Sequence, residues 1–175
     1  MPHTALLIID VQNEVMKGAW REAEVLAAIA DLAARARAAG APVIYLQHEE
    51  PGTPMARGER GWEIHPAVRP AAGEPVIGKL ASDGFYRTTL GEELARRGVS
   101  RLVICGAQTD FCVDATTRAA LSAGFDVTLA ADAHTTGDGV ISAVDAIAHH
   151  NRVLGWLAHP DHRVTVRPAA EIAFA

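Results

Sequence analysis

Three residues of this sequence have side chains of the types that thiol-based acyl transfer requires. Asp10 comes directly after a short apolar run, Lys79 follows a second such run, and Cys112 comes shortly after a third. A thiol can attack a carbonyl carbon, a carboxylate can move protons, and an ammonium group can supply positive charge beside both. We therefore take Asp10, Lys79 and Cys112 as candidate catalytic residues.

The segment ICGAQTDFCVDATTRAALSAG, residues 104–124, contains both cysteines of the chain. Thr109 or Asp110 is the expected N-cap of a helix that would place Cys112 in its first turn. The positive end of the helix dipole favours an anion there and can lower the pKa of a thiol. The alternative is that Cys112 is only a buried, small apolar residue, which is what we expect of Cys105 inside its apolar run.

Taken singly, Asp10 could be a helix cap and Lys79 a solvated loop residue. With a strand order of 3-2-1-4-5, Lys79 would start about 10 Å from the strand that bears Asp10, which is two spacings of about 4.8 Å. The long lysine side chain would then have to lean back over the sheet. The occurrence of all three groups at strand ends favours a common crevice.

The elements that must position these groups alternate between short β-branched apolar runs and longer helical patterns, which predicts an α/β fold. Apolar strands of this kind indicate a mostly parallel sheet covered on both faces. We expect one domain, residues 1–175, with a three-layer α/β/α, Rossmann-like architecture. Its six strands are predicted at 5–9, 43–47, 75–78, 101–105, 125–131 and 163–167, and its helices at 20–39, 88–97, from about 112 to 124, and 139–157.

The composition limits the classes of partner. The chain has 175 residues, of which 49% are hydrophobic and 21% charged, and a net charge of -5 without a long block of like charge. This gives no indication of nucleic-acid or membrane binding and favours a small-molecule substrate. Two cysteines, no cationic leader and no apolar run of membrane-spanning length predict a reducing, cytoplasmic location.

Several cofactor motifs are missing from the sequence. No glycine precedes Gly18 in the turn after Asp10, so a dinucleotide fingerprint is absent, as are a phosphate-binding loop and a Gly-x-Ser-x-Gly elbow. The histidines, including His48 and His65 and the adjacent pair at 149–150, match no zinc signature. We expect no cofactor and no bound metal.

The segment that follows Gln47, up to about Gly73, is rich in glycine, proline and charge and shows no clear periodicity. Loops of this length inside a domain are usually lids or binding segments, and the alternative is a disordered surface excursion. Trp62 and Ile64 favour an ordered, functional loop.

Three motifs resemble the isochorismatase-like cysteine hydrolases, a superfamily that includes nicotinamidases and N-carbamoylsarcosine amidases. They are ALLIIDVQNEV, VIGKLASDGFYRTTL and LVICGAQTDFCVDATTRAALSAGFDVTLAADAHTT, and the likeness extends to at least Leu157. The resemblance implies Cys112 as the nucleophile, Asp10 as a proton shuttle and Lys79 as the group that orients and charges the pair.

The resemblance also implies a cis peptide between Ala107 and Gln108 and an oxyanion hole formed by the amides of Gln108 and Cys112. It further implies a homodimer or homotetramer. The candidate substrate contacts are Gln12, Trp62, Phe85 and Tyr86.

This sequence departs from the pattern of the resemblance in two places. Gln47-His48-Glu49-Glu50 stands where nicotinamidases have an Asp-x-His metal loop, and Val15 stands where an aromatic residue is usual. The first departure argues against metal-assisted binding of nicotinamide, and the second predicts that one wall of the pocket differs.

The expected reaction is hydrolysis of an amide-type carbon–nitrogen bond of a small molecule through a thioester on Cys112. Two alternatives remain open. One is isochorismatase-type cleavage of a vinyl ether, in which Asp10 would protonate the substrate and no thiol is needed. The other is a non-catalytic small-molecule-binding protein with the same fold.

Overall fold

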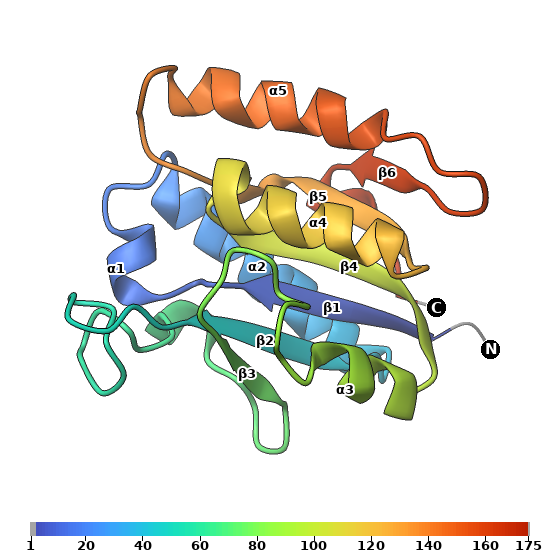
Figure 1. Cartoon of the computed structure of the whole chain (residues 1–175), viewed down its shortest axis with the longest axis horizontal. Coiled ribbons are helices and arrows are strands. Elements are labelled where there is room, and N and C mark those ends of the chain that lie inside the picture. Colours follow the sequence, from blue (N-terminus) through green and yellow to red (C-terminus); the bar gives the residue numbers. More distant parts are fainter. Residues whose placement is uncertain (1–2, 175) are drawn as a thin grey trace.

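Six strands form one all-parallel sheet in the computed structural model, which describes residues 3–174 (Figure 1). The strand order is β3-β2-β1-β4-β5-β6, which contains the order assumed in the sequence analysis and adds the sixth strand beside β5. The strands are β1 (His3–Ile9), β2 (Val43–His48), β3 (Val76–Lys79), β4 (Val99–Ala107), β5 (Asp126–Thr135) and β6 (Val164–Arg167).

Strand β1 lies in the middle of the sheet and is buried on both faces. Residues 5–9 have no exposed surface. Leu6 and Ile8 pack in one hydrophobic core, whereas Leu7 and Ile9 pack in a second core on the opposite face. This is the burial that a continuous apolar run predicts for a central parallel strand.

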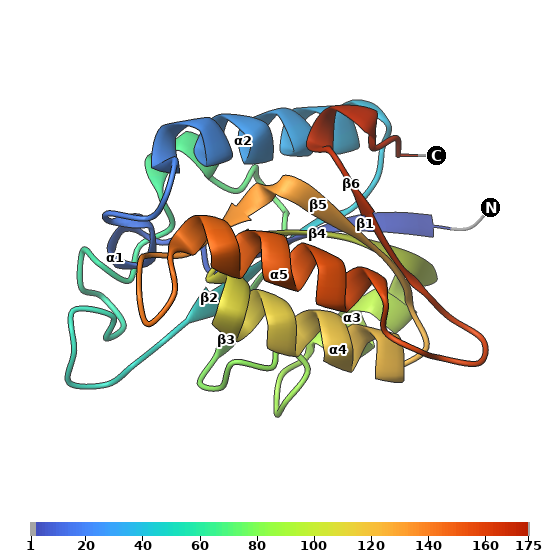
Figure 2. The ribbon, with the colours of Figure 1, turned by 90° about the horizontal axis from the view of Figure 1, so that it is seen from above.

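Helices cover both faces of this sheet, which confirms the predicted three-layer α/β/α class. Figure 2 shows α2 (Glu22–Ala38) on one face and α3 (Leu90–Arg96), α4 (Asp114–Ser122) and α5 (Ala143–Gly155) on the other. Short 3-10 turns occupy Pro66–Val68 and Ala169–Glu171. A four-residue helix, α1 (Asn13–Met16), follows β1 and was not predicted.

Both ends of helix α2 carry residues that are typical of helix ends. Its first turn contains Glu22 and Glu24 and its last turn contains Arg35 and Arg37, which matches the sign of the helix dipole. Gly40 follows with a φ of 69°, a conformation that glycine adopts at little cost. None of the helices within residues 3–174 combines the length and apolar character that a membrane crossing requires.

Two strands run further than predicted. Strand β4 continues to Ala107 and β5 continues to Thr135, and their pairing is irregular between Ile104 and Gly106. Gly106 has a φ of 123°, and a Cβ atom at this position would overlap the backbone of Ile9 on β1. The break in the apolar run at Gly106 therefore reflects a close backbone approach between β1 and β4.

The segment between β2 and β3 lacks regular strands but is fixed by hydrogen bonds to the residues after β1. The amide of Asn13 donates to Glu63, that of His65 donates to Val11, and Gln12 forms an isolated bridge with Ile64. Met55 is buried. These contacts favour the ordered loop of the two alternatives and place it at the carboxyl end of the sheet.

Candidate active site

The candidate site lies where the sheet changes its direction of winding. The chain moves outward from β1 through β2 to β3, and then returns to place β4 on the other side of β1. Ligands of open parallel sheets bind at such points, beyond the carboxyl ends of the strands. Asp10 follows β1 there, with a positive φ of 47°, which is uncommon for a residue other than glycine. The side chain of Asp10 is buried, so Asp10 is not a solvent-exposed helix cap.

Lys79 contacts both of the other candidate catalytic residues, Asp10 and Cys112. Its Nζ atom lies 2.7 Å from Oδ2 of Asp10 and 3.2 Å from Sγ of Cys112, and it donates to the carbonyl oxygen of Ala81 at 3.0 Å. Lys79 and Asp10 are 3% and 1% exposed, so both charges are removed from water and each depends on the other. The lysine side chain thus leans across β2, as the strand order requires.

Cys112 lies on a π-helical turn, Thr109–Val113, that leads directly into α4. The amides of Phe111 and Val113 both donate to the carbonyl oxygen of Gln108, which fixes this turn after β4. The prediction that Thr109 or Asp110 caps a helix is wrong, because no side chain caps this turn and both residues bond to β5 or the segment after it.

The protonation state of Cys112 also differs from the prediction. Burial, followed by the negative charge of Asp10, raises the pKa of the Cys112 thiol to about 12, against the lowering effect of Lys79. The dipole of a short helical turn does not compensate for the loss of water around a buried sulfur. The resting enzyme therefore holds a thiol beside an ion pair rather than a thiolate. Cys105 is fully buried within β4, as predicted.

Helix α4 holds the lysine loop in place. The hydroxyl of Thr116 donates to the carbonyl oxygen of Ser82 at 3.2 Å and accepts from the amide of Gly84 at 3.0 Å. A Cβ atom at Gly84 would overlap the side chain of Leu46 and press on Thr116. Helix α4, which continues from the turn that carries Cys112, is thus hydrogen-bonded to the loop that follows Lys79.

A pocket of about 450 Å³ opens above these groups. Asp10 and Cys112 lie at its base, together with Gln108. Its remaining walls come from α1, the end of β2, the loop after β2, the lysine loop and the π-helical turn: Glu14, Val15, His48, Glu50, Met55, Ser82 and Phe111. The volume suits a small molecule.

Known proteins share this arrangement of elements. A sequence model of the isochorismatase domain matches residues 4–155. The chain belongs to the isochorismatase family. A streptothricin hydrolase from Streptomyces noursei is 41% identical over 184 aligned positions, covering 99% of this chain and 72% of that protein.

Solved structures of isochorismatase-family proteins have the same fold. An isochorismatase from Pseudomonas putida superimposes with a TM-score of 0.85 at 32% identity, over 97% of this chain and 90% of that one. N-carbamoylsarcosine amidase from Thermoplasma acidophilum gives a TM-score of 0.78 at 26% identity, over 97% and 98% of the two chains.

Other expectations for this isochorismatase-family chain concern the turn after β4. The peptide between Ala107 and Gln108 is cis, as the family resemblance implied. Gln108 lies in the pocket wall next to Cys112. Both residues of the expected oxyanion hole are therefore at the base of the pocket.

The predicted substrate contacts Gln12 and Trp62 hold the loop instead of lining the pocket. Gln12 is fully buried, and its amide donates to the carbonyl oxygens of His48 and Trp62 and accepts from the amide of His48. The carbonyl of Trp62 also accepts from the side chain of Gln47. The ring of Trp62 lies 5.9 Å from the guanidinium of Arg57, outside the residues that line the pocket.

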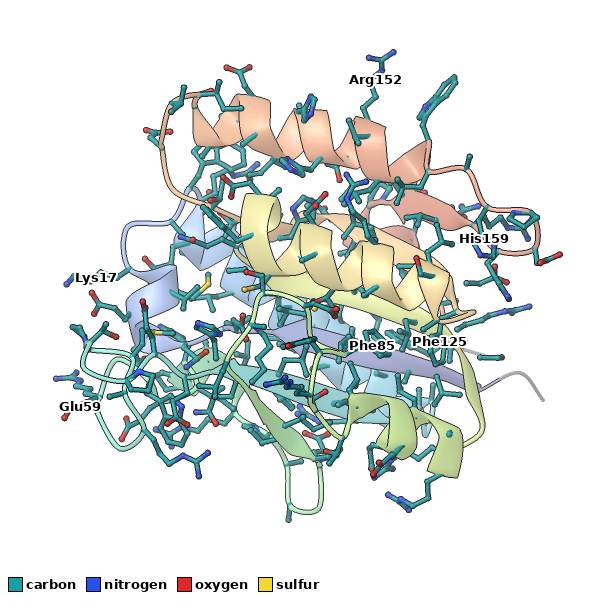
Figure 3. All side chains as sticks on the ribbon, in the orientation of Figure 1. Lys17, Glu59, Phe85, Phe125, Arg152 and His159 are labelled. Atoms are coloured by element: carbon teal, nitrogen blue, oxygen red, sulfur yellow. The ribbon has the colours of Figure 1, made fainter. Side chains whose placement is uncertain are left out.

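Phe85 and Tyr86 also lie outside the pocket wall. Figure 3 shows Phe85 beside Phe125, and their ring centroids are 5.9 Å apart. Because Phe125 precedes β5, this contact lies toward the amino end of the sheet, away from Cys112. Tyr86 is 53% exposed and packs against the guanidinium of Arg87.

His48 is a pocket residue whose position the sequence analysis did not recognise. It ends β2, which lies between the strands of Asp10 and Lys79, and its Nδ1 atom is 3.4 Å from the Lys79 ammonium. Burial, and then the charge of Lys79, lowers the pKa of His48. The position of His48 could have been recognised from the strand order, because the residue that ends β2 must lie between Asp10 and Lys79. Residues 3–174 contain no cluster of three or more His, Cys, Asp or Glu side chains placed to share a metal ion.

A second buried polar group contacts the π-helical turn of Cys112 from the side of β5. The side-chain amide of Asn151 donates to the carbonyl oxygen of Ala131, so its Oδ1 atom accepts from Nε2 of His134 at 2.9 Å. Nδ1 of His134 then accepts from the hydroxyl of Thr109 at 2.9 Å. Burial lowers the pKa of His134 to about 4, so the ring is neutral near pH 7. We call Thr109, His134 and Asn151 the histidine cluster.

Proposed function

We propose that this isochorismatase-family hydrolase cleaves a carbon–nitrogen bond of a small amide through a thioester on Cys112. The observation that carries the proposal is the contact of one buried ammonium, Lys79, with both the Asp10 carboxylate and the Cys112 sulfur. The names of two relatives, a streptothricin hydrolase and an N-carbamoylsarcosine amidase, agree with hydrolysis of this type.

The first half of the reaction starts from the resting thiol. As Sγ of Cys112 attacks the substrate carbonyl carbon, its proton passes to the Asp10 carboxylate, and Lys79 stabilises the negative charge that develops on sulfur. The amides of Gln108 and Cys112 donate to the carbonyl oxygen as it becomes an oxyanion. Asp10 then gives its proton to the leaving nitrogen, the carbon–nitrogen bond breaks, and a thioester remains.

The second half of the reaction hydrolyses the thioester. Asp10, again a carboxylate, removes a proton from an incoming water molecule, and the resulting hydroxide attacks the thioester carbon. The carbon–sulfur bond breaks, the sulfur recovers the proton held by Asp10, and a carboxylic acid is released. One water is consumed for each amide cleaved.

The position of Lys79 favours this chemistry over cleavage of a vinyl ether. An acid-catalysed vinyl ether cleavage requires a proton donor but makes no use of a sulfur atom. Here the ammonium lies 3.2 Å from Sγ, where it can stabilise a thiolate during the reaction. A binding protein would have no need to bury this ion pair beside a thiol.

The test compares wild type with Cys112→Ala on a panel of small amides, ureas and lactams. We expect turnover to fall by at least about 10³-fold in the variant. Mass spectrometry of rapidly quenched wild-type reactions should show an acyl group on Cys112. Cys105→Ala is the matched control, because Cys105 is buried and does not line the pocket. Undiminished turnover by Cys112→Ala would refute the proposal.

A further inference from the structure

The pocket above Cys112 carries more negative charge than the proposed chemistry uses. Besides Asp10, two carboxylates line it: Glu14 on α1 and Glu50 just after β2. Neither carboxylate takes part in the thioester steps, and no lysine or arginine side chain lines this pocket. The two glutamates therefore bear on the charge of the ligand that this pocket binds.

The basic groups near the pocket are already engaged elsewhere or point into solvent. Lys79 is paired with Asp10, and Arg57 is paired with Glu49 at 3.0 Å. Glu14 has only a 3.5 Å contact with Lys17, whose side chain is 75% exposed and lies at the outer edge of the molecule in Figure 3. Such exposed pairs neutralise little charge.

Glu50 is less compensated still. It forms no ion pair within residues 3–174. His48, the nearest ring in the pocket, is uncharged near pH 7, because burial and Lys79 lower its pKa. Two carboxylates thus face a concave, partly apolar site without protein cations opposite them, an arrangement that concentrates negative potential.

The backbone is held in place at both glutamates. The amide of Glu14 donates to the carbonyl oxygen of Gly61, and that of Glu50 donates to the carbonyl oxygen of Met55. Two separate segments therefore present their charges to the same cavity. The backbone of the site therefore does not need to move when a cation enters, and the two side chains, of which Glu50 is exposed and Glu14 is 38% exposed, can turn toward it.

The buried carboxylate of Asp10 is also available to hydrogen-bond donors of a ligand in this pocket. Asp10 is 1% exposed, and its Oδ1 atom accepts no hydrogen bond from any group within residues 3–174. Asp10 also lines the pocket. A buried carboxylate oxygen without a donor is costly, and an N–H group of the ligand can serve it beside the Cys112 thiol, which also hydrogen-bonds to Asp10.

The other walls specify how a cation would be presented. Val15 and Met55 offer apolar surface that can cover methylene groups, and Phe111 is an aromatic residue that is 56% exposed at the pocket. Aromatic faces attract ammonium and guanidinium groups. The walls therefore suit a chain of methylenes that ends in a positive charge.

We infer that the substrate is a small amide that carries an organic cation, an ammonium or guanidinium group, held by Glu14 and Glu50 while its carbonyl lies at Cys112. The inference rests on the proposed function, because it assigns the cation to the part of the substrate that does not react. Residues 3–174 hold no cluster arranged to bind a metal ion, which favours an organic cation over an inorganic one.

The experiment compares ω-amino amides with ω-hydroxy amides of the same chain length as substrates. We expect wild type to prefer the charged series by about 10²-fold in kcat/KM, mainly through a lower KM. Glu14→Gln and Glu50→Gln should each lower this preference by about tenfold, and the double variant should remove it. Equal use of the two series by wild type overturns the inference and leaves the amide-hydrolase proposal intact.

A matched control and a second readout separate the two proposals. Glu59 is exposed on the same loop, at the edge of the molecule in Figure 3, and does not line the pocket, so Glu59→Gln should keep the full preference. Calorimetry on Cys112→Ala should show that the ω-amino amide binds more tightly than the ω-hydroxy amide and weakens with added salt. Binding without any turnover by wild type contradicts the proposed function alone. Equal or absent binding of the two amides contradicts the inference.

Discussion

The chain contains two buried polar clusters on opposite sides of the turn that carries Cys112. The lysine cluster, Asp10, Lys79 and Cys112, is charged, lies at the base of a pocket and leaves Oδ1 of Asp10 without a donor. The histidine cluster is neutral, and both ring nitrogens of His134 have partners. The two clusters are buried to a similar degree, so burial alone does not distinguish a reactive site from a structural one. The two clusters differ in that only the lysine cluster has an atom, Oδ1 of Asp10, that lacks a hydrogen-bond donor and belongs to a residue lining the pocket.

Removal of the cation from the lysine cluster should have the largest effect. Lys79→Met leaves the Asp10 carboxylate buried without a counter-charge, so we expect a loss of about 3–5 kcal/mol in the free energy of unfolding. Activity should fall by about 10²–10⁴-fold. Urea unfolding and amide turnover measure the two effects.

The double variant Asp10→Asn with Lys79→Met sharpens this prediction. It removes both charges, so stability should recover to within about 1–2 kcal/mol of wild type while activity stays low. A double variant as unstable as Lys79→Met would show that the ion pair is not what stabilises this region.

Gly106 joins the two clusters and should be nearly as sensitive. It pairs with Ile9 on β1 and with His134 on β5. Gly106→Ala forces a Cβ atom against the backbone of Ile9 at a φ that side chains rarely adopt. We expect a loss of about 3 kcal/mol in stability together with reduced activity, measured by thermal unfolding and turnover. Wild-type values for both would contradict the close approach of β1 and β4.

Acid should destabilise the protein through the histidine cluster. The pKa of His134 falls from 6.5 in the unfolded chain to about 4 in the folded protein, so the unfolded state binds more protons between these values. The contribution of neutral His134 is complete above pH 6.5 and is lost as the pH falls toward 4, with a magnitude on the order of 3 kcal/mol. Urea unfolding across this pH range measures it.

His134→Gln provides the control for the acid prediction. The variant is less stable at neutral pH, but its stability should depend less steeply on pH between 6.5 and 4. An unchanged slope would assign the acid sensitivity to other groups.

The smallest of these effects should come from Thr109→Val. The variant removes the hydroxyl that donates to Nδ1 of His134 and leaves that buried nitrogen without a donor. We expect a loss of about 1–3 kcal/mol in stability and about a tenfold lower kcat, because the turn that carries Cys112 is less firmly held. Thr109→Ser, which retains the hydroxyl, should restore kcat; failure to do so would separate the hydrogen bond from catalysis.

The sequence predicted the fold and the lysine cluster because both are encoded locally. Continuous apolar runs marked the strands, and parallel strands bring their ends to one edge of the sheet, so Asp10 and Lys79 could be placed at one edge, with an assumed strand order setting their separation. Cys112 followed from its place after β4. The small differences at the ends of β4 and β5 arise where a backbone approach, at Gly106, decides the geometry instead of periodicity.

The walls of the pocket could not be predicted in the same way. Glu50 and Met55 lie in an irregular segment whose path is set by long-range hydrogen bonds. Phe85 packs against Phe125 and not in the pocket wall. The protonation state of Cys112 depended on burial, which no local pattern reports. The grouping of polar side chains at strand ends was therefore predictable, whereas most of the residues that line the pocket were not.

The way Trp62 is held has a consequence for how such proteins diversify. Gln12 and Gln47 both donate to its carbonyl oxygen, a feature that every amino acid supplies. Replacement of the indole by another side chain would leave this attachment unchanged. During evolution this part of the loop can accordingly acquire new side chains while its backbone stays attached to β2 and to the residue that follows Val11.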